Sequence, residues 1–469
     1  MKNIFFILLG LGLHCNAQMY INKVTSYNPL MGHTTSNGMN LNPLNSINEI
    51  GNIFWLNSNV IKFSTTGSND TSFGTNGSIN VVANSLIKAY QCRVLKNNLY
   101  IFADNALEVM GKFDFNGVKD TSFGTNGVVA WPSLNLDTTP KIIANNDGTY
   151  FLSANDKTDG WKLKIIKLTS SGQIDTNFSM IDIEGASAST FKDILPLSDD
   201  KFLVIRKSNS IDEVYIDKYT NLGVKDINFG NLGTLTVNTP SSLFFVNSLN
   251  EIFNLNNSTT QQYLKKYNSD GSVDLSFANN GIFNISTFNT GYNININNID
   301  FDSVNNILLF GGGDISSANI FIGRITSTGS LDNTFNNNTA YYKAAEVLTN
   351  NISGKVINDN EFICFTRTPS SSLVSYRGSK FIRSSSQSLS VLEEKADEFK
   401  IYPNPAADFI IIDLPENEKI HKVNIYSLTG ELVINSTDSK ININNLNTGN
   451  YIIEVIGSNK KYKRKFIKN

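Results

Sequence analysis

Histidine is scarce in this chain, whose 469 residues include only His14, His33 and His421. Most catalytic schemes that need a general base or a metal ligand use histidine. His33 stands alone near the N-terminus, and no Ser lies in a Gly-x-Ser-x-Gly sequence, so nothing indicates a nucleophilic enzyme. A glycosidase needs only two carboxylates, and a hydrolase of that kind stays open. We predict no catalytic residue, no cofactor and no metal site.

Cysteine is equally rare, with three residues. Cys15 lies in an N-terminal segment that we expect to be removed, so the mature chain keeps Cys92 and Cys364. An exported protein can oxidise such thiols, but a disulfide requires Cα atoms within about 7 Å of each other. The two cysteines fall in repeat units that are not neighbours, which favours two buried free thiols.

Charge is low as well: Asp, Glu, Lys and Arg make up 17% of the chain, and the net charge is -2 at pH 7. No overall field of either sign would attract nucleic acid or an anionic membrane. We therefore predict that nucleic acid is not a partner.

Long hydrophobic runs are missing, apart from ten residues between Ile4 and Leu13. That run is too short to span a membrane, which takes about 20 residues as a helix. Together with Lys2 before it and the small residues Cys15 and Ala17 after it, the run is typical of a secretory signal peptide. We predict a signal peptide over residues 1–17, cleaved between Ala17 and Gln18, and no transmembrane segment. Small residues do not precede Cys15, which argues against lipidation.

The rest of the chain is typical of β-structure. Phe, Tyr, Ile and Val fill the apolar runs, while Asn, Ser, Thr and Gly crowd the segments between them. One element, Asp-x-x-Phe, recurs at intervals of 48 to 58 residues. Its members are Asp70 with Phe73, Asp120 with Phe123, Asp175 with Phe178, Asp226 with Phe229, Asp274 with Phe277, and Asp332 with Phe335.

A repeat of about 50 residues with three or four short strands has the size of one β-propeller blade. Seven hairpins support a count of seven: residues 53–63, 99–113, 150–168, 202–219, 252–267, 307–325 and 362–382. We expect each unit to begin with the first strand of its hairpin, as Tyr150 to Ala154 does. The strands after Tyr20 would complete the last blade. The predicted fold is all-β, with a seven-bladed β-propeller over residues 18–383.

These units resemble the delta-60 repeat family of bacterial surface and secreted proteins, whose signature is a turn followed by Asp-x-x-Phe-Gly-x-x-Gly. The Gly after Phe is present as Gly74, Gly124 and Gly230, whereas Ser179, Ala278 and Asn336 replace it elsewhere. The resemblance covers residues 50–385. It implies a repeat fold in a surface or secreted protein, and it says little about activity.

The six recurring Asp residues favour a structural role. Such a side chain accepts hydrogen bonds from backbone N–H groups two or three residues later and closes a turn, while the Phe packs between blades. Loops such as 114–120 and 268–274 contain carboxylate and amide groups that suggest a calcium site, but they lack the terminal bidentate Glu of an EF-hand. Gly311 to Gly313 indicates a turn. If one face binds sugar, the loops with Trp131 and Trp161 are the first candidates.

The C-terminal segment has its own pattern. Alternating strands run from Phe409 to Ile467, which predicts a small antiparallel β-sandwich. Its motif residues are Tyr402, Pro403, Asn404, Pro405, Gly430, Gly449, Tyr451, Lys463, Arg464 and Lys465. Residues 397–469 resemble the type A sorting domain of the type IX secretion system of Bacteroidetes. Residues 384–396 form a polar linker before it.

The resemblance implies export rather than catalysis. It names as partners the outer-membrane translocon and the sorting peptidase, and it implies passage through the periplasm to the medium or the outer cell surface. For the residues before it, the leading hypothesis is a non-enzymatic binding or adhesion module for a glycan or a surface protein. An extracellular hydrolase that acts on polysaccharide, with carboxylates on one propeller face, is the alternative. A surface scaffold is a third.

Overall fold

The computed structural model divides the chain into two compact units, Met1–Gln387 and Ser388–Asn469. The residues that it describes are 19–24, 26–27, 30–34, 47–48, 51–56, 59–86, 89–104, 108–130, 141–156, 158–160, 162–183, 189–239, 242–256, 262–291, 293–313, 319–345, 352–368, 373–384, 399–414, 418–427, 430–458 and 461–469. The predicted signal peptide with Ala17 and Gln18, most of the predicted linker, Trp131 and Trp161 lie outside these residues.

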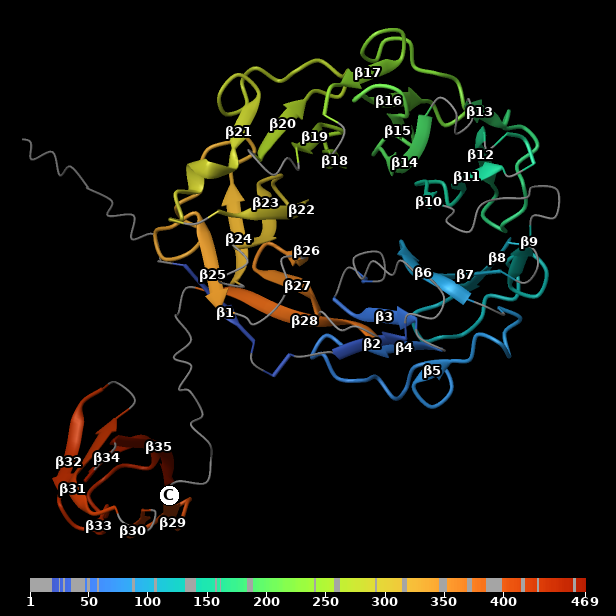
Figure 1. Ribbon diagram of the computed structural model, residues 1–469. Helices are drawn as coiled ribbons and strands as arrows, with labels where there is room; N and C mark the ends of the chain where they lie inside the picture. The colour runs from blue at the N-terminus through green and yellow to red at the C-terminus, as the bar shows by residue number, and fades with distance from the viewer. Residues whose placement is uncertain are drawn as a thin grey trace, which may run out of the picture. The chain divides into compact units, whose positions relative to one another are not determined.

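The regular secondary structure of the described residues is β-strand, apart from one 3-10 helix, η3 (Ile285–Phe288). None of their helices is long and apolar enough to cross a membrane. In the first unit they form seven antiparallel sheets, which follow one another around a ring (Figure 1).

Five of these sheets contain four strands that are consecutive in the chain. They are β6 (Ala89–Leu95), β7 (Asn98–Asp104), β8 (Glu108–Phe113) and β9 (Val128–Ala130); β10 (Lys141–Ala144), β11 (Tyr150–Asp156), β12 (Lys162–Leu168) and β13 (Ile181–Ile183); β14 (Ser189–Pro196), β15 (Phe202–Ser208), β16 (Val214–Tyr219) and β17 (Thr234–Val237); β18 (Ser242–Val246), β19 (Ile252–Asn256), β20 (Tyr263–Tyr267) and β21 (Ile282–Asn284); β22 (Asn295–Phe301), β23 (Ile307–Gly312), β24 (Asn319–Ile325) and β25 (Tyr341–Ala345). A sixth sheet has three strands, β3 (Ile53–Leu56), β4 (Val60–Phe63) and β5 (Ser78–Ile79).

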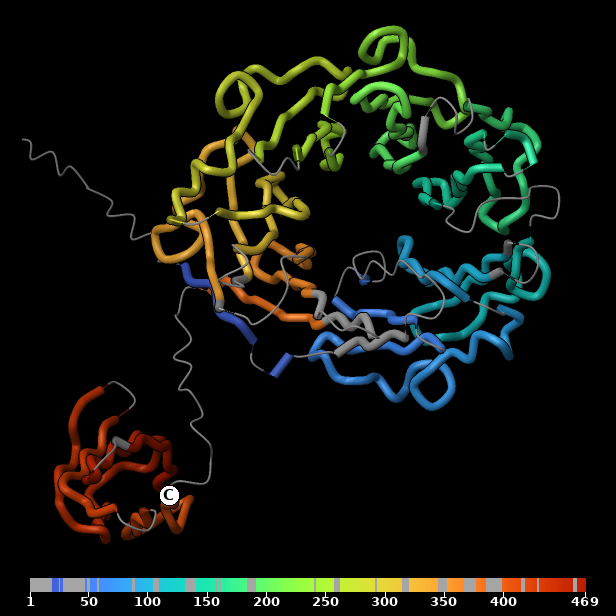
Figure 2. Tube along the Cα trace, viewed as in Figure 1, coloured from blue at the N-terminus to red at the C-terminus, as the bar shows by residue number. Residues whose placement is uncertain are grey.

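The seventh sheet joins the two ends of the unit. Its strands β26 (Ile352–Asn358), β27 (Glu361–Thr368) and β28 (Leu373–Ser384) are consecutive, and β1 (Tyr20–Lys23) and β2 (Leu30–Thr34) both pair with β28. Tyr20 lies opposite Ser384, and Leu30 lies opposite Arg377. The Cα trace shows the beginning of the unit alongside its end (Figure 2). The predicted completion of the last unit by N-terminal strands is confirmed.

In six of the seven sheets of the first unit the predicted hairpin is the central strand pair, and there the predicted start of the unit is wrong. Among the described residues, the sheet of β3, β4 and β5 begins at Ile53, as predicted. The sheet that contains β11 begins one strand earlier, at β10, and the same holds for its neighbours. These first strands lie on the inner side of the ring (Figure 1). Several are rich in polar residues; β22, for example, contains three Asn and one Asp, residue types that are depleted in strands. Their sequences therefore lack a clear strand pattern.

The glycines after Phe310 also differ from the prediction. Gly311 and Gly312 belong to β23 and do not form a turn. A Cβ atom at Gly311 would lie 2.2 Å from the backbone oxygen of Asn295 on the adjacent strand β22. Glycine is therefore required by the close approach of two backbones.

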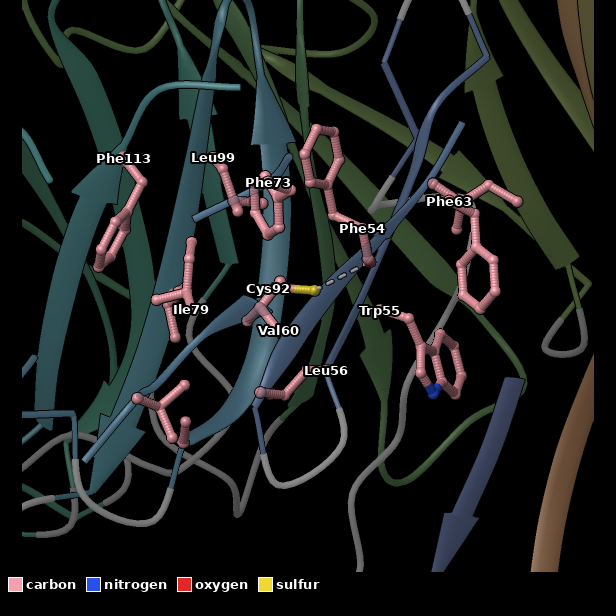
Figure 3. Packing of buried hydrophobic residues seen from close by; sticks show 14 of the residues in the cluster. Phe54, Trp55, Leu56, Val60, Phe63, Phe73, Ile79, Cys92, Leu99 and Phe113 are labelled. Atoms are coloured by element: carbon pink, nitrogen blue, oxygen red, sulfur yellow. Dashed lines mark hydrogen bonds between the residues drawn. The ribbon is translucent and has the colours of Figure 1, made fainter. Parts of the chain in front are cut away.

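The hydrophobic core lies between successive sheets. One cluster contains Phe54, Phe73 and Ile79 from the β3–β5 sheet and Leu99 and Phe113 from the next sheet (Figure 3). Sheets packed face to face in this way exclude water from both faces, which no single sheet of this size achieves alone.

Both described cysteines are buried and free, as the sequence predicted. Cys92 lies in the cluster of Figure 3, where its thiol donates to the carbonyl of Phe54 at 3.3 Å. Cys364 lies in β27, and burial raises the pKa of its thiol far above the usual value.

The turns between the first and second strands connect neighbouring sheets. The Asn146 N–H donates to Asp200 at 2.6 Å, the Ser198 N–H to Asn250 at 2.7 Å, and the Ser303 N–H to Asp359 at 2.8 Å. Each acceptor side chain belongs to the turn of the following sheet. A series of hydrogen bonds thus holds the inner part of the ring in register.

The second unit contains two sheets around one core. One sheet has β29 (Lys400–Tyr402), β30 (Phe409–Asp413) and β33 (Lys440–Asn442); the other has β31 (Ile420–Ser427), β32 (Leu432–Ser436), β34 (Gly449–Gly457) and β35 (Lys461–Lys468). Ile410 and Ile441 from the first sheet share a cluster with Ile425, Ile453 and Phe466 from the second. The predicted strands begin at Phe409, so the sequence analysis missed β29, which is three residues long and is followed by Pro403.

Removing side-chain volume at the junction of the two chain ends tests the closing sheet. Ile21 is 4% exposed and packs with Phe335 and Phe362. We expect Ile21→Ala to lower the free energy of unfolding by about 2–5 kcal/mol, because the cavity adds to the lost burial. Urea denaturation of the exported protein measures this. Leu275→Ala, at a 68% exposed position, serves as the control and should change the value by less than about 0.5 kcal/mol. Equal effects of the two substitutions would contradict the expectation.

Candidate functional site

A cluster of three side chains recurs with every Asp-x-x-Phe element. A basic residue eight positions before the Asp is the last but one residue of the preceding strand, and its carbonyl accepts from the N–H of the Asp. We call each set of basic residue, Asp and Phe a repeat cluster. The basic members are Lys62, Lys112, Lys167, Lys218, Lys266 and Arg324.

Most of the basic residues form an ion pair with the Asp of their own cluster. The separations are 2.9 Å for Lys62 and Asp70, 2.9 Å for Lys112 and Asp120, 4.0 Å for Lys167 and Asp175, 3.0 Å for Lys266 and Asp274, and 2.5 Å for Arg324 and Asp332. The fourth cluster differs, because Asp226 pairs with Lys201 at 3.1 Å and Lys218 donates to the carbonyl of Ser269.

Each of the six Asp side chains also closes a turn. Its Oδ1 accepts from the backbone N–H two residues later, at distances from 3.0 to 3.3 Å. The N–H of the cluster Phe donates to the carbonyl of the same Asp. Hydrogen bonds from Ser72 and then from Lys62 lower the pKa of Asp70, and Ser122 and Lys112 lower the pKa of Asp120 in the same order.

The six Phe side chains are buried between sheets, none more than 8% exposed. In five of the six clusters, the cation lies 5.1 to 6.0 Å from the centroid of the Phe ring. At this distance a cation is attracted to an aromatic face. A turn glycine of the next repeat covers the ring. At Gly172, whose φ is +83°, an added Cβ would lie 2.7 Å from Phe123.

The repeat clusters thus connect neighbouring sheets and lie apart from one another. Gly124, after Phe123, donates to the carbonyl of Ser171 in the next repeat at 2.7 Å, and Gly230 donates to Asp270 at 2.8 Å. The structure places each of the six carboxylates in a different sheet and does not bring them together. The sequence analysis missed the basic member; its fixed position eight residues before Asp was the signal that an internal alignment would have shown.

The proposed calcium loops hold their own hydrogen bonds. Asp114 accepts from the N–H groups of Asn116 and Val118 at 2.9 and 2.8 Å, and Asp270 accepts from Ser272 at 2.8 Å. Among the residues that the structure describes, no group of three or more His, Cys, Asp and Glu side chains could hold a metal ion.

In the second unit, the Tyr402 to Pro405 motif lies against the last strand. The Oδ1 atom of Asn404 accepts from the Ile467 N–H at 2.9 Å, and Ala406 donates to the Ile467 carbonyl at 2.8 Å. Pro403 and Pro405 have no N–H to offer. The motif therefore covers part of the outer edge of β35, a sheet edge that would otherwise be free to pair with another strand.

The remaining motif residues surround the same sheet. Tyr451 is buried, stacks on Phe466 with ring centroids 5.7 Å apart, and donates to the Asn447 carbonyl at 2.9 Å. Gly430, with φ +87°, donates to the Ser427 carbonyl and closes the turn before β32. Gly449 is the first residue of β34.

Three consecutive basic residues in the middle of β35 face solvent. Lys463, Arg464 and Lys465 are exposed. The Lys463 ammonium forms an ion pair with Glu454 across the sheet at 3.1 Å, and Arg464 donates to the carbonyl of Phe399. Two of the three cations therefore contribute to the fold of this unit while remaining accessible.

Comparison with protein families gives one match. Residues 400–469 match the family described as the secretion system C-terminal sorting domain. A sorting domain of the type IX secretion system directs the protein that carries it to the cell surface or the medium, so this chain is exported. No curated protein sequence matches the chain.

Solved structures with similar folds include prolyl oligopeptidase B from Galerina marginata, at 9% identity and a TM-score of 0.45, over 94% of this chain and 56% of that one. The Cps50 (Swd1) β-propeller domain from Myceliophteria thermophila has 7% identity and a TM-score of 0.39, over 76% and 98%. The extracellular domain of the two component system BT3049 from B. thetaiotaomicron has 9% identity and a TM-score of 0.36, over 96% and 61%. Likeness at this level assigns no function.

Neutralising one repeat cluster tests its contribution to stability. We expect Asp120→Asn to lower the free energy of unfolding at pH 7 by about 0.5–1.5 kcal/mol, through loss of the charge-assisted contacts. Because the folded state lowers the pKa of Asp120, this contribution is present above the usual Asp pKa of about 4 and is lost as the pH falls through the lowered value.

Urea denaturation from pH 7 to pH 3 measures both effects. The difference between Asp120→Asn and the parent protein should shrink as the medium becomes acidic. Asp212→Asn, at an exposed bend, is the control and should follow the parent protein throughout. A difference at Asp120 that stays constant down to pH 3 would rule out the charge as its source.

Proposed function

We propose that the exported cargo is a seven-bladed β-propeller that acts as a non-enzymatic binding or adhesion module for a glycan or a surface protein. We propose further that residues 397–469 form a small β-sandwich that engages the type IX translocon and is removed by the sorting peptidase. On this proposal residues 1–17 are the signal peptide, 18–383 the propeller and 384–396 the linker. Export itself follows from the family match.

The seven sheets and their closure support the propeller. Each sheet packs its apolar faces on two neighbours, and β1 and β2 add to the sheet of β26, β27 and β28. Closure of this kind leaves no sheet at a free end of the ring. The spacing of Asp-x-x-Phe supports membership of the delta-60 repeat family and, with the sorting domain, an origin in the Bacteroidetes.

One observation supports a binding role over an enzymatic one. The six recurring Asp residues form ion pairs and hydrogen bonds that stabilise the fold. Every Asp of the repeat clusters is bound by backbone N–H groups and a cation of its own sheet. A polysaccharide hydrolase needs two carboxylates that face a shared substrate. One pair, Asp159 and Asp182, shares the ammonium of Lys164 at 2.6 and 2.9 Å, so both carboxylates already contact a cation of their own sheet.

Deletion of the C-terminal unit tests the sorting role. We expect a chain without residues 397–469 to accumulate in the periplasm, because the translocon would have nothing to recognise. Cell fractionation and immunoblotting give the location. Full-length Leu275→Ala, altered only at an exposed position of the first unit, is the control and should reach the surface or the medium. Appearance of the truncated chain outside the cell would contradict the proposal.

A glycan array probed with the exported protein tests the binding role. We expect binding to a restricted set of glycans, and no release of shorter sugars from those glycans in a parallel incubation. Release of reducing ends from a bound polysaccharide would replace the binding module with the hydrolase. Binding to no glycan, together with no capture on the surface of intact cells, would favour the scaffold.

A further inference from the structure

Three first strands bring two cations and one carboxylate into the same part of the inner ring. Arg93 belongs to β6, Lys141 to β10 and Asp193 to β14, which are the first strands of three successive sheets (Figure 1). The Lys141 ammonium and the Asp193 carboxylate are 3.7 Å apart. We call these three residues, with Gln91, the inner cationic cluster.

Arg93 is the unusual member of the cluster. It is 8% exposed. When the Gln91 amide is turned by 180°, which satisfies both of its ends, its oxygen accepts from Nε and Nη2 of Arg93 at 3.0 and 3.2 Å. Asp193 pairs with Lys141, and no ion pair between described residues includes Arg93. Burial lowers the pKa of Arg93, and the charge of Asp193 opposes that effect. A buried guanidinium with no ion-pair partner among the described residues is costly to maintain for stability alone.

Lys141 adds to the excess of positive charge. Burial lowers the pKa of Lys141, the Asp193 carboxylate raises it, and the charge of Arg93 lowers it again. In the part of the chain that the structure describes, one carboxylate thus serves two cations. The Lys141 side chain is 30% exposed and that of Asp193 is 45% exposed, so solvent reaches the cluster beside the more deeply buried Arg93.

Another part of the same inner ring shows how the fold satisfies a charge that has only a structural role. Lys355 on β26 pairs with Asp300 on β22 at 3.1 Å, and the same Asp300 oxygen accepts from the Val356 N–H at 2.9 Å. Here each charge has a partner and the contact joins two sheets. The inner cationic cluster, also on first strands, has two cations for one carboxylate among the residues that the structure describes.

We propose that the inner cationic cluster binds an oxyanion, the carboxylate or sulfate group of an acidic ligand, between Arg93 and Lys141. A guanidinium presents parallel N–H donors that match two oxygens of such a group, and an ammonium adds a point charge. The ligand compensates the charge that Asp193 leaves unpaired. This inference rests on the proposed binding function and defines the chemical class of its ligand.

Calorimetric titration of the exported full-length protein tests the site, with D-glucuronate, glucose 6-sulfate, succinate and D-glucose as probes at low ionic strength. We expect the three anions to bind and D-glucose not to bind. Equal affinities for succinate and glucuronate would show recognition of the carboxylate alone, and tighter binding of glucuronate would show that the sugar ring also contributes. Either result supports the oxyanion site.

Substitutions identify the residues responsible. Arg93→Met should weaken binding of the anions about tenfold to a hundredfold, as expected for loss of a charge-assisted contact, while the protein keeps its fold because an apolar chain of similar length replaces a buried charge. Lys141→Gln alters a partly exposed side chain and should weaken binding about tenfold. Lys355→Gln removes the ammonium that is already paired with Asp300 and is the matched control; its affinities should equal those of the parent protein.

Two results would overturn the proposal: no anion binds at concentrations up to about 10 mM, well above the dissociation constant of even a weak specific site, or Lys141→Gln and a folded Arg93→Met bind the anions as the parent protein does. Binding of neutral glycans on the array without anion binding would overturn the site and leave the proposed function standing. Anion binding that depends on Lys141, without any glycan or cell-surface hit, would support the site and count against the proposed partners.

Discussion

The pairing of β1 with β28 is the constraint on which the first unit depends. Each sheet buries its apolar residues only by packing against a neighbour on either side, and a row of such sheets would expose one face at each end. Strands from both ends of the unit meet in one sheet and remove that difficulty. Ile21, from the first strand, packs in the same core as Leu308 and Phe362, so the closing sheet is part of the hydrophobic core as well as of the hydrogen-bond network.

The repeat clusters explain how the intermediate sheets keep a constant relation to one another. An Asp fixes a turn, a cation lies over the neighbouring Phe, and a glycine of the next repeat covers that ring. The glycine is needed for two reasons, because its φ is left-handed and because a Cβ would collide with the ring. A change in the constant spacing between these groups would affect two sheets at once, whereas a change on an outer turn would affect none.

The burial of each residue determines which parts of the fold and of the candidate site could be predicted from the sequence. The central hairpins were predictable because both strands are buried on two faces along most of their length and are rich in large apolar residues, as in β11 and β12. The first strands were not, because polar residues such as Asn297 and Asn298 bond to the N–H groups of β26 rather than to solvent. In the sequence, Lys112 resembles an ordinary surface charge, because only the packing of the folded chain brings its ammonium over the ring of Phe123. Likewise, the contact of Asn404 with Ile467 joins residues 63 positions apart, and Arg93 has no local pattern that sets it apart.

The length of chain between the paired strands has a consequence for assembly. The side chains of Asn22 and Ser384 are hydrogen-bonded across 362 positions of sequence, and bringing two such distant points together in a flexible chain costs on the order of 5 kcal/mol in loop-closure entropy. Every other sheet of the first unit is built from strands that are consecutive in the chain, so it forms without that cost. Once those sheets have stacked, the two ends are already near each other. The local repeats, rather than the closing strands themselves, therefore determine how readily the ring shuts.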